Sequence, residues 1–418
     1  MSFARIEPEP LLVPADPAAD PVRSLANARV AIVHYWFVSH RGGERVVESI
    51  ASMFPQADLF SLVVDPETLP DSLRRRSMQT SFLQNIPGSR RWHRHLLPLY
   101  PLALEQFDLS GYDLVISSES GPAKGVLTSA HTCHLCYCHS PMRYLWDFYH
   151  RYQRSEGFGR LTRPAFTLAS HYLRLWDVAS SGRVDYFIAN SHNVAARIRK
   201  HYRRDAAVVH PPVNVQAGYL ADRPSDYYLV VGQLVDYKRI DLAIAASNRL
   251  GRRLHVVGAG EQYSRLKKLA GPTIHFCGAL SDGELHKQYA HCRALLFPAE
   301  EDFGIVPVEA LSFGRPVIAF GRGGARETIN GFEAGAPNPA VETSSGIFFP
   351  EQSPQSLADA ILVFESVEHR FSPFLIRQQS ERFTPEQFQK KFRHCLAEGW
   401  AEFHNGPSRA ARFGVPSL

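Results

Sequence analysis

Short apolar runs alternate with helical patterns along this chain, and the alternation occurs in both halves. The runs cover residues 29–33, 59–64, 113–118, 133–138, 184–191 and 207–212, then 227–232, 253–260, 273–278, 294–298 and 316–320. Such runs are typical of buried parallel strands with helices between them. A chain of 418 residues is too long for a single hydrophobic core. We therefore predict an α/β protein with two doubly wound domains that face each other across a cleft.

Changes in composition give the predicted boundaries. Residues 1–27 mix proline with acidic residues and lack periodicity, so we expect a disordered tail there. Residues 28–213 form the N-terminal domain, and Pro211-Pro212 with the polar stretch behind it marks a linker. Residues 214–384 then form the C-terminal domain.

A separate helix is predicted in residues 385–418. Thr384 suits the N-cap, Pro385 the first helical position and Gln387 the third. An apolar stripe at a spacing of four residues follows: Phe388, Phe392, Leu396 and Trp400. We expect this helix to cross between the domains and to pack back on the N-terminal one.

Composition excludes several classes of protein. The net charge of +5 is mild, and no nucleic-acid-binding motif accompanies it, so we expect no nucleic-acid partner. The six cysteines lack the pattern of a secreted disulfide framework. No apolar run approaches the roughly 20 residues of a transmembrane helix, and the acidic start does not resemble a signal peptide. We expect a soluble, cytoplasmic protein.

One segment of the N-terminal half interleaves arginine with aromatic and apolar residues. It comprises residues 73–76 and 90–100, the latter reading RRWHRHLLPLY. Such segments can lie on an anionic membrane surface. They are also compatible with a solvated helix face beside a small additional core. Both interpretations stay open, and the first would make the protein peripheral on the inner face of the plasma membrane.

Three cysteines and three histidines lie within residues 131–139. A zinc site is the obvious interpretation, but no second pair of ligands follows at a suitable distance. Residues 133–138 instead alternate like a buried strand, in which cysteine serves as a small apolar residue. We therefore expect no metal. His139 differs, because it follows the strand's carboxyl end, where α/β sheets place ligand-binding groups.

The stretch from Phe297 to Gly324 carries the most specific pattern. Glu301 and Glu309 are separated by seven residues, and a loop at Gly304 turns into a helix between them. A helix N-terminus offers backbone N–H groups to a diphosphate, and carboxylates accept hydrogen bonds from sugar hydroxyls. Acidic residues also stabilise a helix start without any ligand. That explanation suits either glutamate alone better than both together.

With these residues in hand, the chain resembles the retaining glycosyltransferases of the GT-B fold, specifically family four. The resemblance extends from about Val30 to Trp400. It rests on Gly42-Gly43, Asn190-Ser191, Gly232 with Lys238, Gly258-x-Gly260, the pair Glu301 and Glu309, and Gly323-Gly324-x-x-Glu327. The phrases HYWFVSHRGGERV, YCHSPMRYLWD and LVDYKRIDLAI are similar to a bacterial mannosyltransferase subgroup of exopolysaccharide and O-antigen synthesis.

The resemblance implies roles for particular residues. The N-terminal domain would bind the acceptor and the C-terminal domain the nucleotide-sugar donor. Glu301 would hold hydroxyls of the transferred sugar, Glu309 the ribose, and His139 would face the donor sugar from the other domain. The remaining implied donor contacts are the loop glycines Gly42 and Gly43, the backbone N–H groups of Gly304, Ile305 and Val306, and the cations Lys238 and Arg239.

One position departs from the family pattern. The family usually carries arginine where this chain has Gln233, so one cation for the diphosphate is missing from its usual place. Arg239, or Arg143 from the other domain, could substitute. Weak activity or a different donor are the alternatives.

The implied reaction is transfer of a hexose, with mannose from GDP-mannose as the leading donor, to a lipid-linked oligosaccharide. Catalysis would involve Glu301, His139 and Lys238, with no protein nucleophile, metal or cofactor. Two alternatives remain open from the sequence. One is a nucleotide-sugar epimerase of the same fold, and the other is a non-catalytic nucleotide-sugar binding protein.

Overall fold

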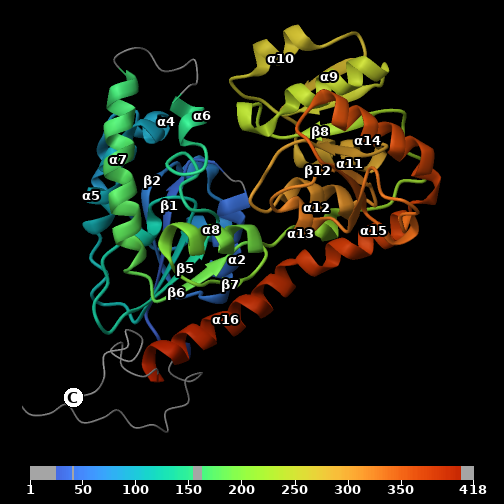
Figure 1. The fold of residues 1–418 in the computed structure, drawn as a ribbon. Coiled ribbons are helices and arrows are strands. Elements are labelled where there is room, and N and C mark those ends of the chain that lie inside the picture. Colours follow the sequence, from blue (N-terminus) through green and yellow to red (C-terminus); the bar gives the residue numbers. More distant parts are fainter. Residues whose placement is uncertain (1–24, 40–41, 154–161, 406–418) are drawn as a thin grey trace, which may run out of the picture.

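The computed structural model describes residues 25–39, 42–153 and 162–405, which form two α/β domains (Figure 1). The N-terminal sheet has the strand order β3-β2-β1-β4-β5-β6-β7, and every neighbouring pair is parallel. Its strands are β1 (Val30–Phe37), β2 (Asp58–Val64), β3 (Met78–Thr80), β4 (Leu114–Glu119), β5 (Cys133–Cys138), β6 (Tyr186–Ala189) and β7 (Ala207–Val208).

The C-terminal sheet repeats this design with the order β10-β9-β8-β11-β12-β14-β13, again entirely parallel. Its strands are β8 (Tyr228–Val231), β9 (Leu254–Val257), β10 (Ile274–Gly278), β11 (Leu295–Phe297), β12 (Val317–Phe320), β13 (Gly331–Glu333) and β14 (Gly346–Phe349). The prediction of two doubly wound domains is therefore confirmed.

Helices connect the strands and cover both faces of each sheet. In the N-terminal domain they are α2 (Gly42–Met53), α3 (Asp71–Arg74), α4 (Ser89–Trp92), α5 (Tyr100–Glu105), α6 (Tyr149–Gln153), α7 (Thr162–Ser181) and α8 (His192–Tyr202). The C-terminal domain contains α9 (Ile240–Leu250), α10 (Tyr263–Leu269), α11 (Asp282–His291), α12 (Ile305–Ser312), α13 (Ala325–Thr328), α14 (Pro354–Val367) and α15 (Pro373–Ser380).

Strand order determines where the ligand-binding edge lies. The order reverses between β1 and β4 in one sheet and between β8 and β11 in the other. Ligands of open α/β sheets bind outside the carboxyl ends of the strands at such points. Residues that follow β1, β5, β8 and β11 are therefore brought to the face between the domains.

Three strands were not predicted, namely β3, β13 and β14. β3 and β13 are three-residue edge strands without a fully buried residue, so neither carries an apolar run. β14 is buried throughout but has only four residues, Gly-Ile-Phe-Phe. Runs this short cannot be assigned from periodicity alone.

The last described helix, α16 (Pro385–Asn405), runs from the C-terminal domain along the N-terminal one (Figure 1). Its cap forms as predicted, since the Gln387 N–H donates to Thr384 Oγ1 at 3.3 Å. The stripe Phe388, Phe392, Leu396 and Trp400 is buried in the N-terminal core. Residues 1–24 of the predicted tail 1–27 and residues 406–418 of the predicted helical segment 385–418 lie outside the described residues.

Within the described part of the chain, no helix is both long and apolar enough to cross a membrane. The three clustered cysteines all lie buried on β5, as the strand interpretation predicted.

Candidate active site between the domains

The loop between β11 and α12 presents the first glutamate. Gly304 precedes α12 with φ 91°, a left-handed conformation that favours glycine. The loop is supported from behind by Gly323 and Gly324. A Cβ on Gly323 would lie 2.4 Å from the carbonyl oxygen of Glu301, and the Gly324 N–H donates to that oxygen at 2.8 Å. Any larger residue would displace the loop, so these glycines position Glu301.

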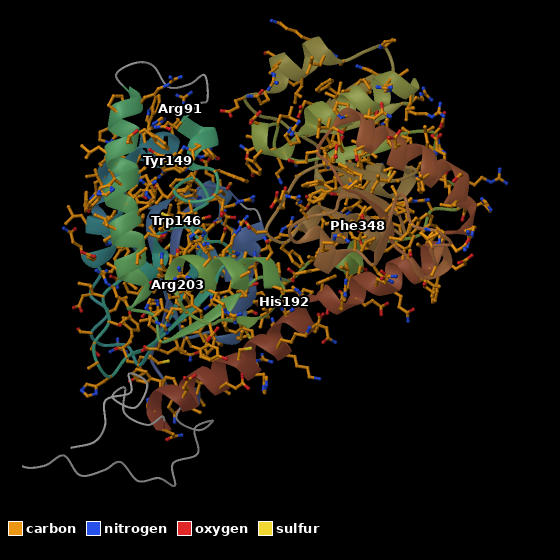
Figure 2. All side chains as sticks on the ribbon, viewed as in Figure 1. Arg91, Trp146, Tyr149, His192, Arg203 and Phe348 are labelled. Carbon is orange, nitrogen blue, oxygen red and sulfur yellow. The ribbon has the colours of Figure 1, made fainter. Side chains whose placement is uncertain are left out.

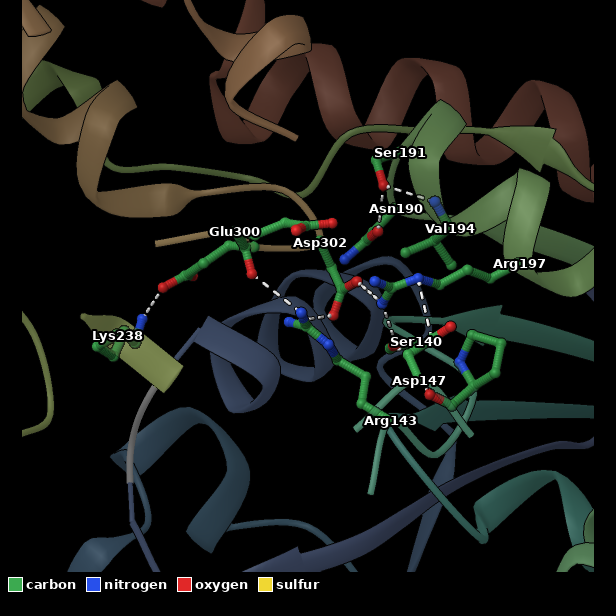
Figure 3. A network of polar contacts seen from close by, with 12 residues as sticks. Ser140, Arg143, Asp147, Asn190, Ser191, Val194, Arg197, Lys238, Glu300 and Asp302 are labelled. Atoms are coloured by element: carbon green, nitrogen blue, oxygen red, sulfur yellow. Dashed lines mark hydrogen bonds and ion pairs between the residues drawn. The ribbon is translucent and has the colours of Figure 1, made fainter. Parts of the chain in front are cut away.

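Lys238 and Glu301 form an ion pair (Figure 3). Lys238 ends the short 3₁₀ helix Asp236–Lys238, which follows β8. Burial lowers the pKa of Lys238, but the charge and hydrogen bond of Glu301, together with Tyr237, outweigh this effect, and the pKa is raised above its ordinary value. Lys238 is therefore a cation at neutral pH. A donor that uses both groups must separate them.

The second glutamate lies one helix turn inside α12. Glu309 Oε2 accepts a hydrogen bond of 2.8 Å from the buried Tyr289 hydroxyl. Its other oxygen lies 3.6 Å from the guanidinium of Arg45, which belongs to α2 of the other domain. Burial raises the pKa of Glu309 above its ordinary value, although Tyr289 and Arg45 oppose that shift.

His139 is the N-terminal domain's contribution to this face. Its Nε2 shares a hydrogen bond of 2.9 Å with the hydroxyl of Ser118, whose carbonyl oxygen accepts one from His34 Nδ1 at 2.9 Å. Burial, with a smaller contribution from His34, lowers the pKa of His139 to about 3. His139 is therefore neutral at physiological pH and can offer a hydrogen bond to a sugar hydroxyl without adding charge.

The two half-sites meet at the glycines that begin α2. A Cβ on Gly42 would lie 2.4 Å from Ile305 Cδ1 of α12, across the domain boundary. A Cβ on Gly43 would lie 4.0 Å from His139 Nε2. Two adjacent residues thus span the distance between His139 and the N-terminus of α12. A side chain at position 42 would displace the end of the Ile305 side chain, whereas a Cβ at position 43 would make ordinary contacts.

Glu327 joins the two domains on the linker side. Its carboxylate accepts hydrogen bonds from the His192 and Asn193 N–H groups at 2.8 and 2.9 Å and contacts His210 Nε2 at 3.0 Å. The C-terminal domain therefore caps helix α8 of the N-terminal domain. His192 is seen on the side of its domain that faces the C-terminal one (Figure 2).

A second connection lies beside Glu301 (Figure 3). Asp302 pairs with Arg143 at 3.3 Å and also with Arg197, both from the N-terminal domain. Arg143 further donates to the Glu300 carbonyl oxygen at 2.9 Å, and Arg197 pairs with Asp147 at 3.3 Å. The loop that carries Glu301 is thus held by its own domain on one side and by two arginines on the other.

Arg239 and Arg143, the two arginines that could replace the cation missing at Gln233, lie in different surroundings. Arg239 pairs with its neighbour Asp241 through contacts of 3.1 and 3.2 Å. Arg143 instead lies near Lys238, close enough to lower the pKa of that lysine, and near the ring of Tyr237. Of the two, Arg143 is the one whose charge is seen to act on Lys238.

Gly258-x-Gly260 has a packing role. A Cβ on Gly258 would lie 1.9 Å from the Gly232 carbonyl oxygen, and one on Gly260 would lie 2.5 Å from that of Leu234. The two glycines let the β9 loop pack against the backbone of the loop that carries Gln233.

Sequence reasoning missed several residues of this site. Arg45, Ser118, Tyr289, Arg197 and Asp302 contact predicted residues or link their loops. Of these, only Asp302 had a visible signal, because it extends the acidic run Glu300-Glu301-Asp302. The others lie on helices or strands, where the sequence pattern gives no reason to expect a ligand contact. Among the described residues, no group of three His, Cys, Asp or Glu side chains could hold a metal ion.

Comparisons with known proteins identify the family to which both domains are similar. The sequence pattern of the family described as Glycosyltransferase Family 4 matches residues 40–217, and that of Glycosyl transferases group 1 matches residues 216–372. The two patterns meet at the linker and together span both domains.

Curated relatives are more distant. The human alpha-1,3/1,6-mannosyltransferase ALG2 is 27% identical over 291 residues, which cover 60% of this chain and 67% of that protein. A GDP-mannose-dependent alpha-mannosyltransferase of Mycobacterium tuberculosis is 38% identical over 115 residues, covering 27% of this chain and 30% of that protein. For several of these relatives the match spans less than two thirds of their length.

Solved structures share the fold. HepE of Anabaena, crystallised with UDP and glucose, superposes with a TM-score of 0.62 at 18% identity, covering 89% of this chain and all of that one. Sucrose-phosphate synthase of Thermosynechococcus elongatus gives the same values. With two family patterns on the two domains, the chain belongs to the GT-B glycosyltransferases of group 1 and family 4.

Proposed function

We propose that the chain is a retaining hexosyltransferase that transfers mannose from GDP-mannose to a lipid-linked oligosaccharide in exopolysaccharide or O-antigen synthesis. The observation that carries the proposal is the Lys238–Glu301 pair beside the N-terminus of α12, with Glu309 on that helix. Named mannosyltransferases among the relatives support mannose and GDP as the donor groups.

In the proposed complex, the donor diphosphate lies at the Gly304, Ile305 and Val306 N–H groups. Lys238 moves from Glu301 to the diphosphate, and Glu301 accepts hydrogen bonds from the sugar hydroxyls. The ribose diol displaces Arg45 from Glu309. Gly42 and Gly43 let the backbone approach the phosphates, and Arg143 supplies the positive charge that Gln233 does not.

The reaction follows from this placement. The bond between the anomeric carbon and the β-phosphate oxygen breaks, and its electrons remain on the phosphate. The acceptor oxygen bonds to that carbon on the same face, and its proton passes to the departing phosphate oxygen. Lys238 and the α12 dipole stabilise the growing negative charge, a contribution that is often the largest in such sites. Neither glutamate attacks carbon, and no metal or cofactor takes part.

Three exposed helices support peripheral attachment to a membrane. On α7, Leu168, Tyr172 and Leu175 form an exposed stripe. Trp92 at the end of α4 and Leu102 of α5 are also exposed, and these helices lie on the same side of the N-terminal domain as α7 (Figure 1). Arg90, Arg91 and Arg94 on this segment would attract anionic lipid headgroups on the inner face of the membrane. If liposomes with anionic lipid fail to recruit the protein, this attachment is refuted.

Donor binding is the first test of the function. Thermal unfolding is compared in GDP-mannose, UDP-glucose and ADP-glucose, because a ligand stabilises the folded state according to its occupancy. We expect the largest shift with GDP-mannose. If no nucleotide sugar raises the midpoint, the protein is not a glycosyltransferase of this donor class.

Product analysis separates the remaining alternatives. The protein is incubated with GDP-mannose alone, and then with membrane extracts that supply lipid-linked acceptors, both with and without chelator. A transferase labels the lipid fraction, an epimerase alters the donor without an acceptor, and a binding protein does neither. Loss of transfer in chelator would refute the metal-free reaction.

A further inference from the structure

Two pairs of serine and histidine lie next to each other in the N-terminal sheet. Ser117 and Ser118 are consecutive residues of β4, so their side chains point to opposite faces of the sheet. Ser117 Oγ lies 2.9 Å from His134 Nε2. Ser118 Oγ lies 2.9 Å from His139 Nε2. Both serines are fully buried. The two pairs therefore have the same chemistry, but only His139 belongs to the face between the domains.

The pair of His134 shows which ring nitrogen carries the proton. His134 Nδ1 lies 3.1 Å from the carbonyl oxygen of Arg183, which can only accept a hydrogen bond. Burial lowers the pKa of His134 to about 4, so the ring is neutral at physiological pH and Nδ1 carries its single proton. His134 Nε2 is then an acceptor, and the Ser117 hydroxyl donates to it.

Hydrogen-bond satisfaction leads to the same tautomer for His139. Among the described residues, His139 Nε2 is the only hydrogen-bond partner of the Ser118 hydroxyl. If Nε2 carried the ring proton, the Ser118 O–H group would be a buried donor without an acceptor, which is a costly arrangement. With the ring proton on Nδ1, Ser118 donates to Nε2 and this cost is avoided.

His34 holds the backbone of the same serine. Its Nδ1 donates to the Ser118 carbonyl oxygen at 2.9 Å. Its buried Nε2 has no partner among the described residues, which suits a lone pair better than an N–H group. A Cβ on Gly43 would lie 3.8 Å from His34 Cε1 and 4.0 Å from His139 Nε2, so both rings lie beside the start of α2. His34 therefore fixes Ser118, and Ser118 orients His139.

We propose that Ser118 is a positioning residue that fixes the ring proton of His139 on Nδ1 and so presents this N–H group to an oxygen of the bound sugar. The inference rests on the proposed function, because the sugar is the one carried by the proposed donor. In His134 the corresponding N–H group is used by a carbonyl oxygen of the protein. His139 Nδ1 has no such partner within the described part of the chain.

The surroundings of His139 leave this donor available to a ligand. The residue is partly exposed and helps to line a pocket of about 280 Å³, together with Trp36, Arg94 and Ser120. An N–H group only donates, so the sugar atom that faces it must be an oxygen that accepts, either of a hydroxyl or of the ring. Burial and, to a smaller extent, His34 lower the pKa of His139 to about 3, so the contact persists across physiological pH.

NMR of isotopically labelled ring nitrogens in the wild-type protein tests the tautomer directly. A nitrogen that carries the proton resonates as a pyrrole-type nitrogen, and a bare one resonates as a pyridine-type nitrogen. The His139 signals are those missing from the spectrum of His139→Asn. We expect a pyrrole-type Nδ1 and a pyridine-type Nε2 at this residue. A proton found on Nε2 would overturn the proposal.

Two alanine variants test the role of the serine. Ser118→Ala and its matched control Ser117→Ala each remove one buried hydroxyl from neighbouring positions of β4. Ser118→Ala should shift both His139 nitrogens toward intermediate values, because the ring then exchanges between its two tautomers. Ser117→Ala should leave the His139 signals unchanged. If Ser118→Ala keeps the wild-type pattern, another group sets the tautomer and the role of Ser118 is refuted.

Calorimetric titration with GDP-mannose and with GDP separates positioning from a general structural effect. Ser118→Ala should weaken GDP-mannose about two- to fivefold, because the apparent Kd rises as the fraction of the competent tautomer falls. GDP, which lacks the sugar, should bind Ser118→Ala as it binds the wild type. Equal weakening of both ligands would refute the contact with the sugar.

A pair of substitutions at His139 itself locates the contacting nitrogen. The amide of His139→Asn can take the place of the Nδ1–H group, whereas the longer His139→Gln places its amide near the position of Nε2. We therefore expect His139→Asn to bind GDP-mannose more tightly than His139→Gln does. The reverse order would place the contact at Nε2 and overturn the proposal.

The same titrations distinguish the two levels of failure. If the wild type binds GDP-mannose and Ser118→Ala has no selective effect on it, only the positioning role fails. If the wild type binds neither GDP-mannose nor GDP, the proposed function fails, and the sugar contact fails with it.

Discussion

At the scale of single residues, the charged groups of the candidate site are paired with one another. Lys238 is paired with Glu301, and Glu309 contacts both Tyr289 and Arg45. These pairings compensate the buried charges. In the proposed function, a donor that uses these groups must replace each pairing with a contact of equal or greater strength. Affinity should therefore depend on the protonation of these groups.

We predict an acid limb in donor affinity caused by Glu309. Its pKa is raised by burial, so its carboxylate becomes protonated at a higher pH than an ordinary glutamate. The protonated group loses acceptor capacity for the ribose diol, and affinity for GDP-mannose should fall as pH drops through the raised pKa. Calorimetric titration between pH 4.5 and 8 measures this. Glu309→Gln should bind roughly tenfold more weakly at pH 7 and should lack the acid limb. An identical limb in both proteins would contradict the assignment.

Gln233 gives a second prediction at this scale. Gln233→Arg should place a cation near the diphosphate and raise GDP-mannose affinity roughly fivefold, the factor that about 1 kcal/mol provides. Gln56→Arg, in the exposed turn at the opposite edge of the N-terminal sheet, adds the same charge as a control. If the two variants bind the donor equally, position 233 does not approach the phosphates.

At the scale of secondary-structure elements, caps at helix N-termini form contacts both within and between the domains. Ser191 caps α8 from within its own chain segment, while Glu327 caps the same helix from the other domain. Ser281 and Glu284 form a capping box on α11. The caps within one domain follow from local sequence. The cap by Glu327 does not.

We predict that Glu327→Gln weakens the folded assembly in a pH-dependent manner. Burial raises the pKa of Glu327, but hydrogen bonds from His210, His192 and Asn193 outweigh it and the net pKa is lowered. The stabilisation by the Glu327 carboxylate is therefore complete above its unfolded-state pKa of about 4.5. It is lost as the pH falls through the lower folded-state pKa of the same group. At pH 7 we expect a loss of about 1 kcal/mol, typical of a helix cap.

Thermal unfolding from pH 7 down to pH 3 tests this prediction. The difference between wild type and Glu327→Gln should narrow as the pH falls. Glu284→Gln, which removes the charge from an exposed cap within one domain, serves as the control. Tryptic cleavage near the linker should accelerate in Glu327→Gln but not in Glu284→Gln. If both variants are cleaved alike, Glu327 does not join the domains.

At the scale of the whole molecule, the relative position of the domains determines whether the site is complete. The contacts of Asp302 with Arg143 and Arg197 join residues more than 100 positions apart. Helix α16 attaches the end of the chain to the N-terminal core and limits how far the domains can separate. Arg143 of the N-terminal domain lies near Lys238 of the C-terminal domain, and Gly42 lies against Ile305 in the same way. We therefore expect turnover to require opening and closing of this face.

We predict that Asp302→Asn favours the open form. This substitution removes the negative charge that lies between Arg143 and Arg197. The two like charges then repel each other. Small-angle scattering should show a larger radius of gyration, and a saturating donor should reduce it. Asp205→Asn, which breaks an exposed pair with Arg199, is the control and should change neither. An unchanged radius in Asp302→Asn would show that this pair does not hold the domains.

Much of the donor half-site could be read from the sequence because its parts are local. A strand end, a glycine turn and a helix start follow one another within a few residues, so Gly304, Glu301 and Glu309 are placed by the chain itself. His139 was assigned in the same way, from its position after a strand. The pocket that Trp36, Arg94, Ser120 and His139 help to line could not be found in this way, because its residues come from four segments that are far apart in the sequence.

The sequence by itself determined that this protein has two parallel sheets, where their ligand-binding edges lie, and which residues each edge carries. Strand periodicity and turn chemistry act over short distances and are visible in one dimension. Only the tertiary structure decided which edge residues pair with one another, such as Lys238 with Glu301. It also showed that the two domains are joined through Asp302 and Glu327. Those contacts depend on the orientation of two domains, which no local pattern encodes.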